Sequence, residues 1–189
     1  VPHKPGSVLI RHFQGTPISL MEEINIDCHK TVIQFITFSD NCEYIVTSSR
    51  KGTLIRIFHA STGHKMKELR RGSDETIINW LSFSSDNKHL LCRSKKGTIH
   101  LFNTDYDDTR RKNNKLLSVT KYLPDYLKGY LPNYLKSEWS FAHFHFPNIT
   151  TVSAFSPEKN RLFVISFKGI VYKINYNNPD YVTIAKQSI

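Results

Sequence analysis

The sequence lacks any apolar run long enough to cross a bilayer, and no signal peptide opens it, so no membrane-spanning helix is expected. Cysteine is rare: Cys28, Cys42 and Cys92 form neither a metal-ligand spacing nor an even disulfide set. We expect all three to be small buried residues in a reducing cytosol. Alanine is scarce while aromatic and β-branched residues are plentiful, which favours β structure.

Catalytic signatures are also missing. The sequence contains no nucleophile elbow, no metal-ligand cluster, no phosphate-cradling glycine loop and no convincing carboxylate pair. An enzyme is therefore the least favoured class of protein, and we expect neither a cofactor nor a metal site.

Acidic residues are the minority: 16 Asp and Glu oppose 26 Lys and Arg, which gives a formal net charge of +10. The imbalance is concentrated between Ser48 and His100, where eleven basic residues oppose four acidic ones. A basic balance favours nucleic acid or an anionic membrane as partner without choosing between them. A solvated basic face is the structural alternative.

A strand–turn–strand unit occurs three times. In each copy a Phe-Ser pair precedes a Lys-Gly turn, and the Phe stands 14 positions before the Gly: Phe38 and Gly52, Phe83 and Gly97, Phe155 and Gly169. An apolar strand follows each glycine, which we expect to adopt positive φ in a hairpin. Repeats of this kind are typical of propeller blades. Residues 7–13 and 18–26 are predicted to be outer strands of a preceding blade.

The predicted fold class is therefore all-β, a partial WD40-like β-propeller of about three and a half blades. We expect the end of one blade in residues 1–28, a second blade in 29–76, a third in 77–146 with a long loop at 103–137, and the last blade in 147–189. So few blades cannot close a ring. We therefore expect that N-terminal blades are missing from this chain and that the open edges favour self-association.

Two adjacent arginines, Arg70 and Arg71, stand between the first two copies of the repeat. Successive side chains of a strand point to opposite faces, so these neighbours cannot easily share one anion. Each guanidinium offers a planar fork of donors that matches phosphate oxygens. The pair therefore predicts two phosphate sites in adjacent blades.

Several motifs occur in a characteristic order: Gly-Thr-Leu-Ile-Arg-Ile-Phe at 52–58, Leu-Arg-Arg-Gly at 69–72, Lys-Gly-Thr-Ile-His-Leu-Phe at 96–102 and Trp-Ser-Phe at 139–141. Together they resemble the PROPPIN family, seven-bladed WD40-like propellers that bind phosphoinositides and include the WIPI proteins. The likeness is greatest to the third and fourth WIPI proteins and corresponds to about the C-terminal half of the family fold. It implies recognition of phosphatidylinositol 3-phosphate and the 3,5-bisphosphate at two sites on the rim.

Carried over residue by residue, the resemblance gives two sets of site residues. The first set is His29, Ser49, Thr53, Arg56 and Arg70. The second set is Arg71, Ser94, Lys96, Thr98 and His100. Arginine forks, hydroxyls and histidines that add charge near an anion suit this chemistry. Alternatively, the hydroxyl residues are turn residues and the histidines cap strands or contact the next blade.

The repeat places members of the two sets at equivalent positions. Ser49 matches Ser94, Thr53 matches Thr98, and His100 takes the strand position that Arg56 holds one blade earlier. One blade-level site is thus predicted to occur twice. The remaining histidines show no ligand spacing and are expected to be structural or exposed: His59, His64, His89, His143 and His145.

A long segment separates Phe102 from Trp139, and its second half alternates Tyr and Leu with Lys in two Tyr-Leu-Pro units. This composition suits a membrane interface, and the corresponding loop of the family inserts into membranes. Packing of the Tyr-Leu-Pro units against the outer strand of the blade is the alternative. The residues expected to insert are Leu116, Leu117, Val119, Tyr122, Leu123, Tyr126 and Leu127.

The predicted function is that of a phosphoinositide reader that acts as a scaffold in autophagy, peripheral on preautophagosomal, endosomal or vacuolar membranes. Its expected partners are phosphoinositide membranes and autophagy machinery, including a lipid-transfer protein. A protein-interaction propeller without lipid binding is the alternative. Nucleic acid is disfavoured, because the basic residues are confined to blade turns without a stacking platform.

Overall fold

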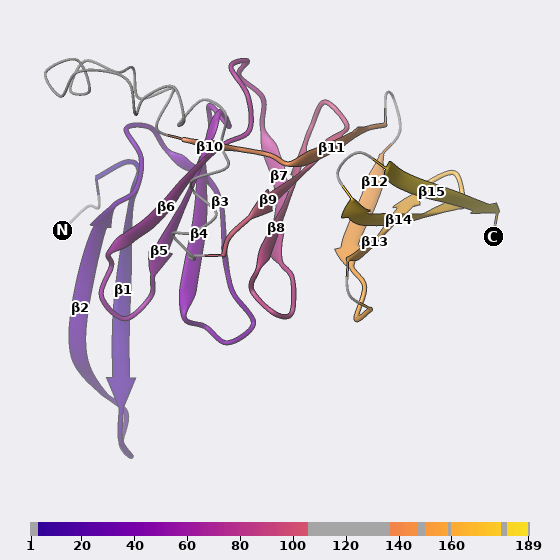
Figure 1. Ribbon diagram of the computed structural model, residues 1–189. Helices are drawn as coiled ribbons and strands as arrows, with labels where there is room; N and C mark the ends of the chain where they lie inside the picture. The colour runs from indigo at the N-terminus through magenta and orange to yellow at the C-terminus, as the bar shows by residue number, and fades with distance from the viewer. Residues whose placement is uncertain (1–3, 106–136, 147–149, 159, 179–180, 189) are drawn as a thin grey trace, which may run out of the picture.

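The structure, a computed structural model, describes residues 4–105, 137–146, 150–158, 160–178 and 181–188. The described residues form β-strands joined by turns (Figure 1). Among them no helix is long and apolar enough to cross a membrane. The all-β prediction is therefore confirmed.

The strands form four sheets. β1 (Ser7–Gln14) and β2 (Ser19–Asp27) make an antiparallel ribbon where two strands were predicted. The second sheet, named here the β3–β6 blade, contains β3 (Ile33–Phe38), β4 (Tyr44–Ser49), β5 (Leu54–His59) and β6 (Lys65–Arg70).

The third sheet, named here the β7–β11 blade, contains β7 (Ile78–Phe83), β8 (His89–Ser94), β9 (Thr98–Asn103) and β11 (Ala142–His145). The fourth contains β12 (Thr151–Phe155), β13 (Arg161–Ser166), β14 (Ile170–Asn178) and β15 (Tyr181–Ser188). The sheets stand one after another along the molecule (Figure 1).

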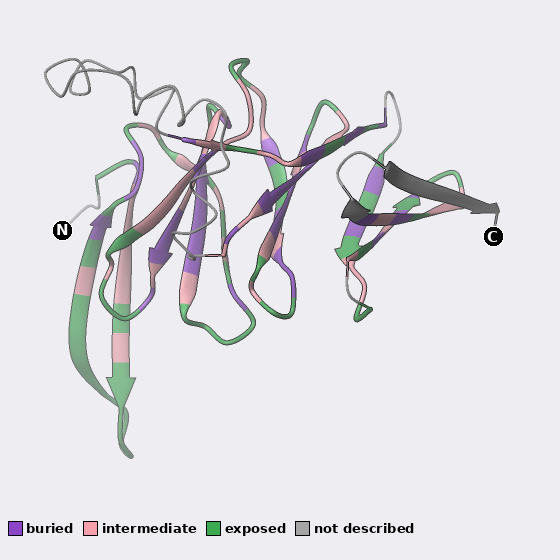
Figure 2. Ribbon diagram, viewed as in Figure 1, coloured by how far each residue is buried: buried purple, intermediate pink, exposed green. Residues whose placement is uncertain are grey.

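Apolar cores join neighbouring sheets, because a two-faced sheet buries its faces against the next one. Val46, Ile57 and Leu69 of the β3–β6 blade pack with Leu81 and Leu90 of the β7–β11 blade. Another cluster joins β8, β9 and β11 to the fourth sheet. Figure 2 shows the consequence: the central strands are buried, while the β1–β2 ribbon is exposed along most of its length.

The repeated turns have the predicted backbone. Gly52, Gly97 and Gly169 have φ of 61°, 81° and 75°. At Gly52 the requirement is steric as well, since a Cβ there would lie 1.8 Å from the Thr76 carbonyl oxygen. The glycine thus lets two blades approach each other at the turn that begins β5.

One expectation was wrong in detail. Cys28 and Cys92 are buried, but Cys42 is exposed, because it lies in a turn with φ of 59°. The Trp-Ser-Phe motif lies between two strands that pair with different blades. Trp139 ends β10 (Glu138–Trp139), which runs parallel to β6 of the preceding blade, whereas the next strand, β11, pairs with β9.

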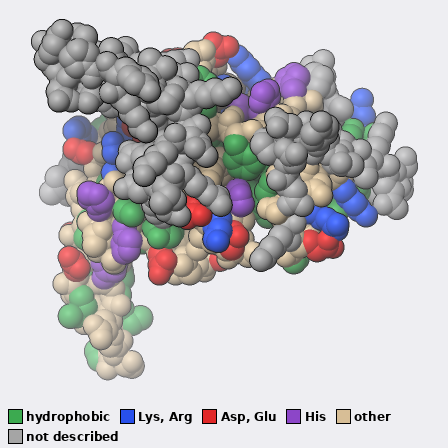
Figure 3. Space-filling model, viewed as in Figure 1, with side chains coloured by type: hydrophobic (Ala, Val, Ile, Leu, Met, Phe, Trp, Pro, Cys, Tyr) green, Lys and Arg blue, Asp and Glu red, His purple; other side chains and the backbone are tan. Residues whose placement is uncertain are grey.

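Charged side chains of both signs are interspersed on the face seen in Figure 3. The β1–β2 ribbon carries a different surface at its projecting end, where Phe13, Ile18, Leu20 and Met21 are all about half exposed or more. On this face the described basic residues therefore do not form one uniform positive surface.

Candidate functional site

A cavity of about 680 Å³ lies at the β3–β6 blade. It contains four of the five residues predicted for the first site: His29 from the segment before β3, Ser49 at the end of β4, Thr53 before β5 and Arg56 within β5. Glu138 of β10 also lines it, so the strand that follows the long insertion supplies part of the wall.

The lining of this cavity is basic. Five basic side chains line it against two carboxylates, Glu68 and Glu138. The basic ones are Lys30, Lys51, Arg56, Lys65 and Lys67. An excess of positive charge in a concave surface favours an anionic ligand.

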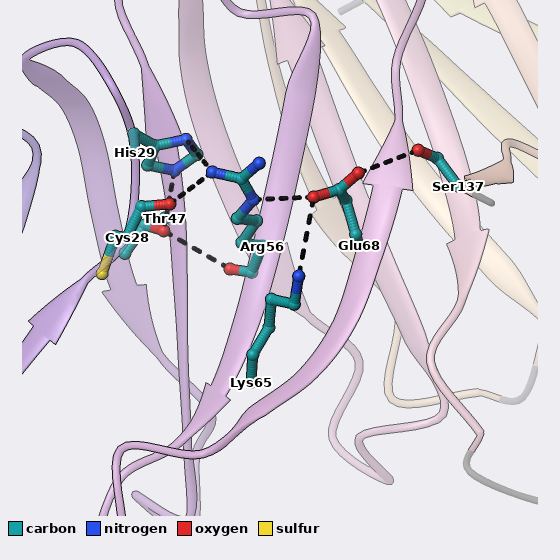
Figure 4. Close-up of polar contacts among 7 residues, drawn as sticks. All are labelled: Cys28, His29, Thr47, Arg56, Lys65, Glu68 and Ser137. Carbon is teal, nitrogen blue, oxygen red and sulfur yellow. Dashed lines mark hydrogen bonds and ion pairs between the residues drawn. The ribbon is translucent and has the colours of Figure 1, made fainter. Parts of the chain in front are cut away.

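Arg56 is the best-fixed cation of the cavity (Figure 4). Its Nε donates to Oε2 of Glu68 at 2.8 Å, and its Nη1 donates to the carbonyl oxygen of Cys28 at 2.5 Å. Its side chain is 21% exposed and that of Glu68 is 17% exposed. The guanidinium is therefore held in place by the protein and reachable from the cavity.

His29 completes the arrangement around Arg56 as a neutral residue. Arg56 Nη1 lies 3.5 Å from His29 Nδ1 and can only donate, so the proton of the neutral ring belongs on Nε2, which faces Thr47 Oγ1 at 3.0 Å. Burial, and then the charge of Arg56, lower the pKa of His29 to about 4. His29 is therefore neutral at neutral pH in this arrangement, and its gain of charge beside a bound anion stays a prediction.

Glu68 connects the cavity to the chain beyond the insertion. Its second oxygen, Oε1, accepts a hydrogen bond from Ser137 Oγ at 3.0 Å (Figure 4). Burial alone would raise the pKa of this carboxyl, but the hydrogen bond and charge of Arg56, with help from Ser137, hold it below its usual value. Glu68 is thus an anion at neutral pH.

Lys67 makes a second connection on the same strand. Its Nζ donates to the carbonyl oxygens of Asn103 and Asp105, and it forms a 3.0 Å ion pair with Glu138. The two described ends of the insertion are therefore both attached to β6.

The two arginines lie in different surroundings, and their assignment to separate phosphate sites stays a prediction. Arg70 ends β6 between Leu54 of β5 and Trp139 of β10, and it is not among the described residues that line the cavity. Arg71 donates through Nε to the Gly52 carbonyl oxygen at 3.0 Å and through Nη2 to the Asp74 carbonyl oxygen. Its charge acts on His100, so it lies toward the β7–β11 blade.

The second set is packed rather than open. Of the three cavities characterised among the described residues, none contains a member of this set. Thr98 Oγ1 lies 3.1 Å from His145 Nδ1, and Ser94 is buried. Lys96 is exposed on the turn.

His100 is enclosed by the segment after the insertion. Its Nδ1 lies 3.2 Å from Ser140 Oγ, and its ring stacks on His143 with 6.1 Å between centroids. Burial, and then the charge of Arg71, lower its pKa to about 4. Like His29, it is neutral at neutral pH in this arrangement, and a charge on it beside a bound anion stays a prediction.

Strand register tests the predicted equivalences. Ser49 pairs with Ile33 as Ser94 pairs with Ile78, so the two serines are equivalent. Arg56 lies opposite Thr47 as His100 lies opposite Cys92 one blade later, which confirms that match as well.

The threonine match is wrong by one residue. Ile55 and Ile99 hold equivalent positions, so Thr98 corresponds to Leu54 in the strand, while Thr53 lies in the turn before it. The turn before β5 is one residue longer than the turn before β9, although the spacing from the glycine is the same. Thr53 and Leu54 both line the cavity, whereas Thr98 contacts His145.

Sequence reasoning missed several residues around both sets. Glu68, Glu138 and Ser137 belong to the cavity or to its hydrogen bonds, and His143 and His145 were read as structural or exposed although they contact the second set. The alternation of His143 and His145 is a strand signal that pairs them with His100 and Thr98 once β11 is aligned with β9. The predicted membrane-inserting residues, from Leu116 to Leu127, lie outside the described residues.

Successive antiparallel blades, joined by apolar cores between sheets, define a partial β-propeller. The model of the PROPPIN family matches residues 5–185, and the chain belongs to that family.

Solved structures share the fold. Kluyveromyces lactis Hsv2 is similar with a TM-score of 0.65 and 22% identity, over 89% of this chain and 51% of that one. KlAtg21, solved in complex with the coiled-coil of AgAtg16, is similar with a TM-score of 0.62 and 22% identity, over 88% of this chain and 46% of that one. The chain thus spans about half the length of the solved structures that it matches.

Proposed function

We propose that this chain contributes to a phosphoinositide-binding propeller that recognises phosphatidylinositol 3-phosphate and the 3,5-bisphosphate on membranes. The observation that carries the proposal is the basic cavity of the β3–β6 blade, where Arg56 is fixed beside the hydroxyls of Ser49 and Thr53. An arginine fork and short-range hydroxyls match the oxygens of a phosphomonoester. Membership of the PROPPIN family supports this ligand class.

The second set is proposed as a further phosphate site around Arg71, Lys96 and His100. Each site alone is expected to bind a lipid headgroup weakly. Once one site has bound, the membrane presents further headgroups to the other site at a high effective concentration, so the two sites together bind the membrane more strongly. The residues from Leu116 to Leu127 are proposed to add insertion into the bilayer.

The proposed cellular role is scaffolding in autophagy at preautophagosomal, endosomal or vacuolar membranes. The solved complex of the similar KlAtg21 with the coiled-coil of AgAtg16 supports a partner among autophagy proteins. A lipid-transfer protein of that machinery is the proposed partner class. The role is that of a binding protein rather than an enzyme.

Liposome flotation tests the proposal. The double substitution Arg70→Thr and Arg71→Thr is expected to abolish flotation with vesicles that contain phosphatidylinositol 3-phosphate. A matched control, Arg11→Thr with Arg161→Thr, removes the same charge from exposed positions on other sheets and should float as the unchanged chain does. Undiminished flotation of the first variant, with its melting temperature preserved, contradicts lipid recognition and favours a protein-interaction propeller.

A further inference from the structure

The cavity of the β3–β6 blade already holds an anion of its own. Glu68 and Arg56 both line it, and the carboxylate occupies the Nε face of the guanidinium at 2.8 Å. A bidentate phosphate needs two parallel donors from one guanidinium. Because Nη1 also donates to the Cys28 carbonyl oxygen, a phosphate that approaches the Nε edge of Arg56 meets donors that are already in use.

The carboxylate has other partners when it gives up Arg56. Its Oε1 accepts from Ser137 Oγ at 3.0 Å, and its Oε2 lies 3.9 Å from Lys65 Nζ (Figure 4). These two contacts come from different parts of the chain, β6 itself and the residue that precedes β10. A buried charge that keeps a cation and a hydrogen-bond donor is far less costly than an unpaired one.

We propose that Glu68 is a built-in counter-anion of this pocket, which a ligand phosphate must displace from Arg56 while Ser137 and Lys65 retain the displaced carboxylate. The inference rests on the proposed function and describes what controls the affinity of the first phosphate site. In the empty pocket Glu68 holds the guanidinium in place and neutralises it. In the occupied pocket the phosphate binds Arg56 in place of Glu68. The affinity for phosphate then depends on how strongly Ser137 and Lys65 stabilise the displaced carboxylate.

The exchange assigns opposite effects to the two partners of one hydrogen bond. Removing the charge of Glu68 removes the competitor, so ligand binding becomes tighter. Ser137 bonds the carboxylate in the structure as it stands, but the carboxylate depends on it more once Arg56 is lost, so removing the hydroxyl costs more in the occupied pocket and ligand binding becomes weaker. A merely structural role predicts that both changes weaken binding, because both break the same contact.

The test measures binding of soluble inositol 1,3-bisphosphate to the full chain by calorimetry, which separates the pocket from any contact with a bilayer. Glu68→Gln keeps the shape of the side chain and is expected to tighten binding about fivefold. Ser137→Ala is expected to weaken it about threefold, because this hydrogen bond exists in both states and only its strengthening in the occupied pocket is lost. In the Glu68→Gln background, Ser137→Ala should change the affinity less than it does alone.

Glu43→Gln is the matched control, because it removes the same charge from an exposed turn outside the cavity lining, and it should leave the affinity unchanged. Unchanged or weakened binding by Glu68→Gln overturns the inference while leaving the proposed function standing. No saturable binding by the unsubstituted chain overturns both. If Glu68→Gln lowers the melting temperature, the sign of the Ser137→Ala effect still decides, since tighter or equal binding there contradicts the exchange.

Discussion

The β3–β6 blade and the β7–β11 blade carry the same repeat, yet they build different environments around it. In the first, Arg56 borders an open basic cavity. In the second, the equivalent position is His100, enclosed by Ser140 and His143 and neutral. The difference arises mainly from the strand that follows: β6 returns directly through a short turn, whereas β11 arrives after the long insertion and covers β9.

The comparison shows that two residues at equivalent positions of a repeat can differ in their accessibility to a ligand. A guanidinium at the strand position keeps its charge at any physiological pH, while an imidazole there loses it on burial. Arg71, the charge nearest His100, is bound to two backbone carbonyl oxygens. The first pocket is therefore open to an anion that displaces Glu68 from Arg56, whereas the second needs rearrangement of the contacts around Arg71 and His100.

The largest effect on stability is expected at Gly52, in the turn where the β3–β6 blade approaches the segment that leads into the β7–β11 blade. Gly52→Ala should destabilise the chain by about 3 kcal/mol or more, because it combines positive φ with a Cβ placed 1.8 Å from the Thr76 carbonyl oxygen. Gly169→Ala, where φ is also positive but no atom lies within 4 Å of the new Cβ, should cost about 1 kcal/mol. Urea denaturation measures both, and equal losses would contradict the close approach at Gly52.

A smaller effect on stability is expected from a change in pH, and it concerns one buried histidine in each environment. His29 and His100 have folded pKa values of about 4, below the usual value of about 6.5 for an unfolded histidine. The unfolded state therefore binds more protons in this interval. The stabilisation is complete above about pH 6.5 and is lost as pH falls toward 4, by up to about 1.4 kcal/mol per pH unit for each histidine.

Denaturation curves between pH 7 and pH 4.5 measure this loss, and His29→Gln and His100→Gln should each flatten it. A slope unaffected by either substitution would mean that the two rings are not held neutral. Flattening by only one of them would sharpen the comparison, because it would show that the two blades bury their histidines unequally.

Much of the fold follows from local signals. The Phe-Ser pair, the Lys-Gly turn and the apolar strands predicted blades, and the positive φ of Gly52, Gly97 and Gly169 confirms the turns. Four of five first-site residues also meet in one cavity. What local signals could not supply was pairing between distant segments, such as Glu68 with Ser137 or the parallel strand β10 beside β6, because nothing in either segment specifies its partner.

The one-residue error at Thr98 has a similar origin. Spacing from the glycine is identical in both copies, but the length of the turn decides which residue begins the strand. A shift of one residue moves a side chain to the opposite face. The lowered pKa values of the two histidines could not be predicted for another reason: burial is a property of the folded chain, and both rings are buried by residues far away in the sequence.

The most direct test compares Arg56→Gln with His100→Gln in binding to vesicles that contain phosphatidylinositol 3-phosphate. Loss of a charge-assisted contact in the open cavity should weaken binding about tenfold or more for Arg56→Gln, while His100→Gln should change it about threefold at most. Circular dichroism confirms that both variants keep their strands. The reverse order, with His100→Gln the more damaging and Arg56→Gln close to the unsubstituted chain, would contradict the claim that the β3–β6 blade holds the principal anion site.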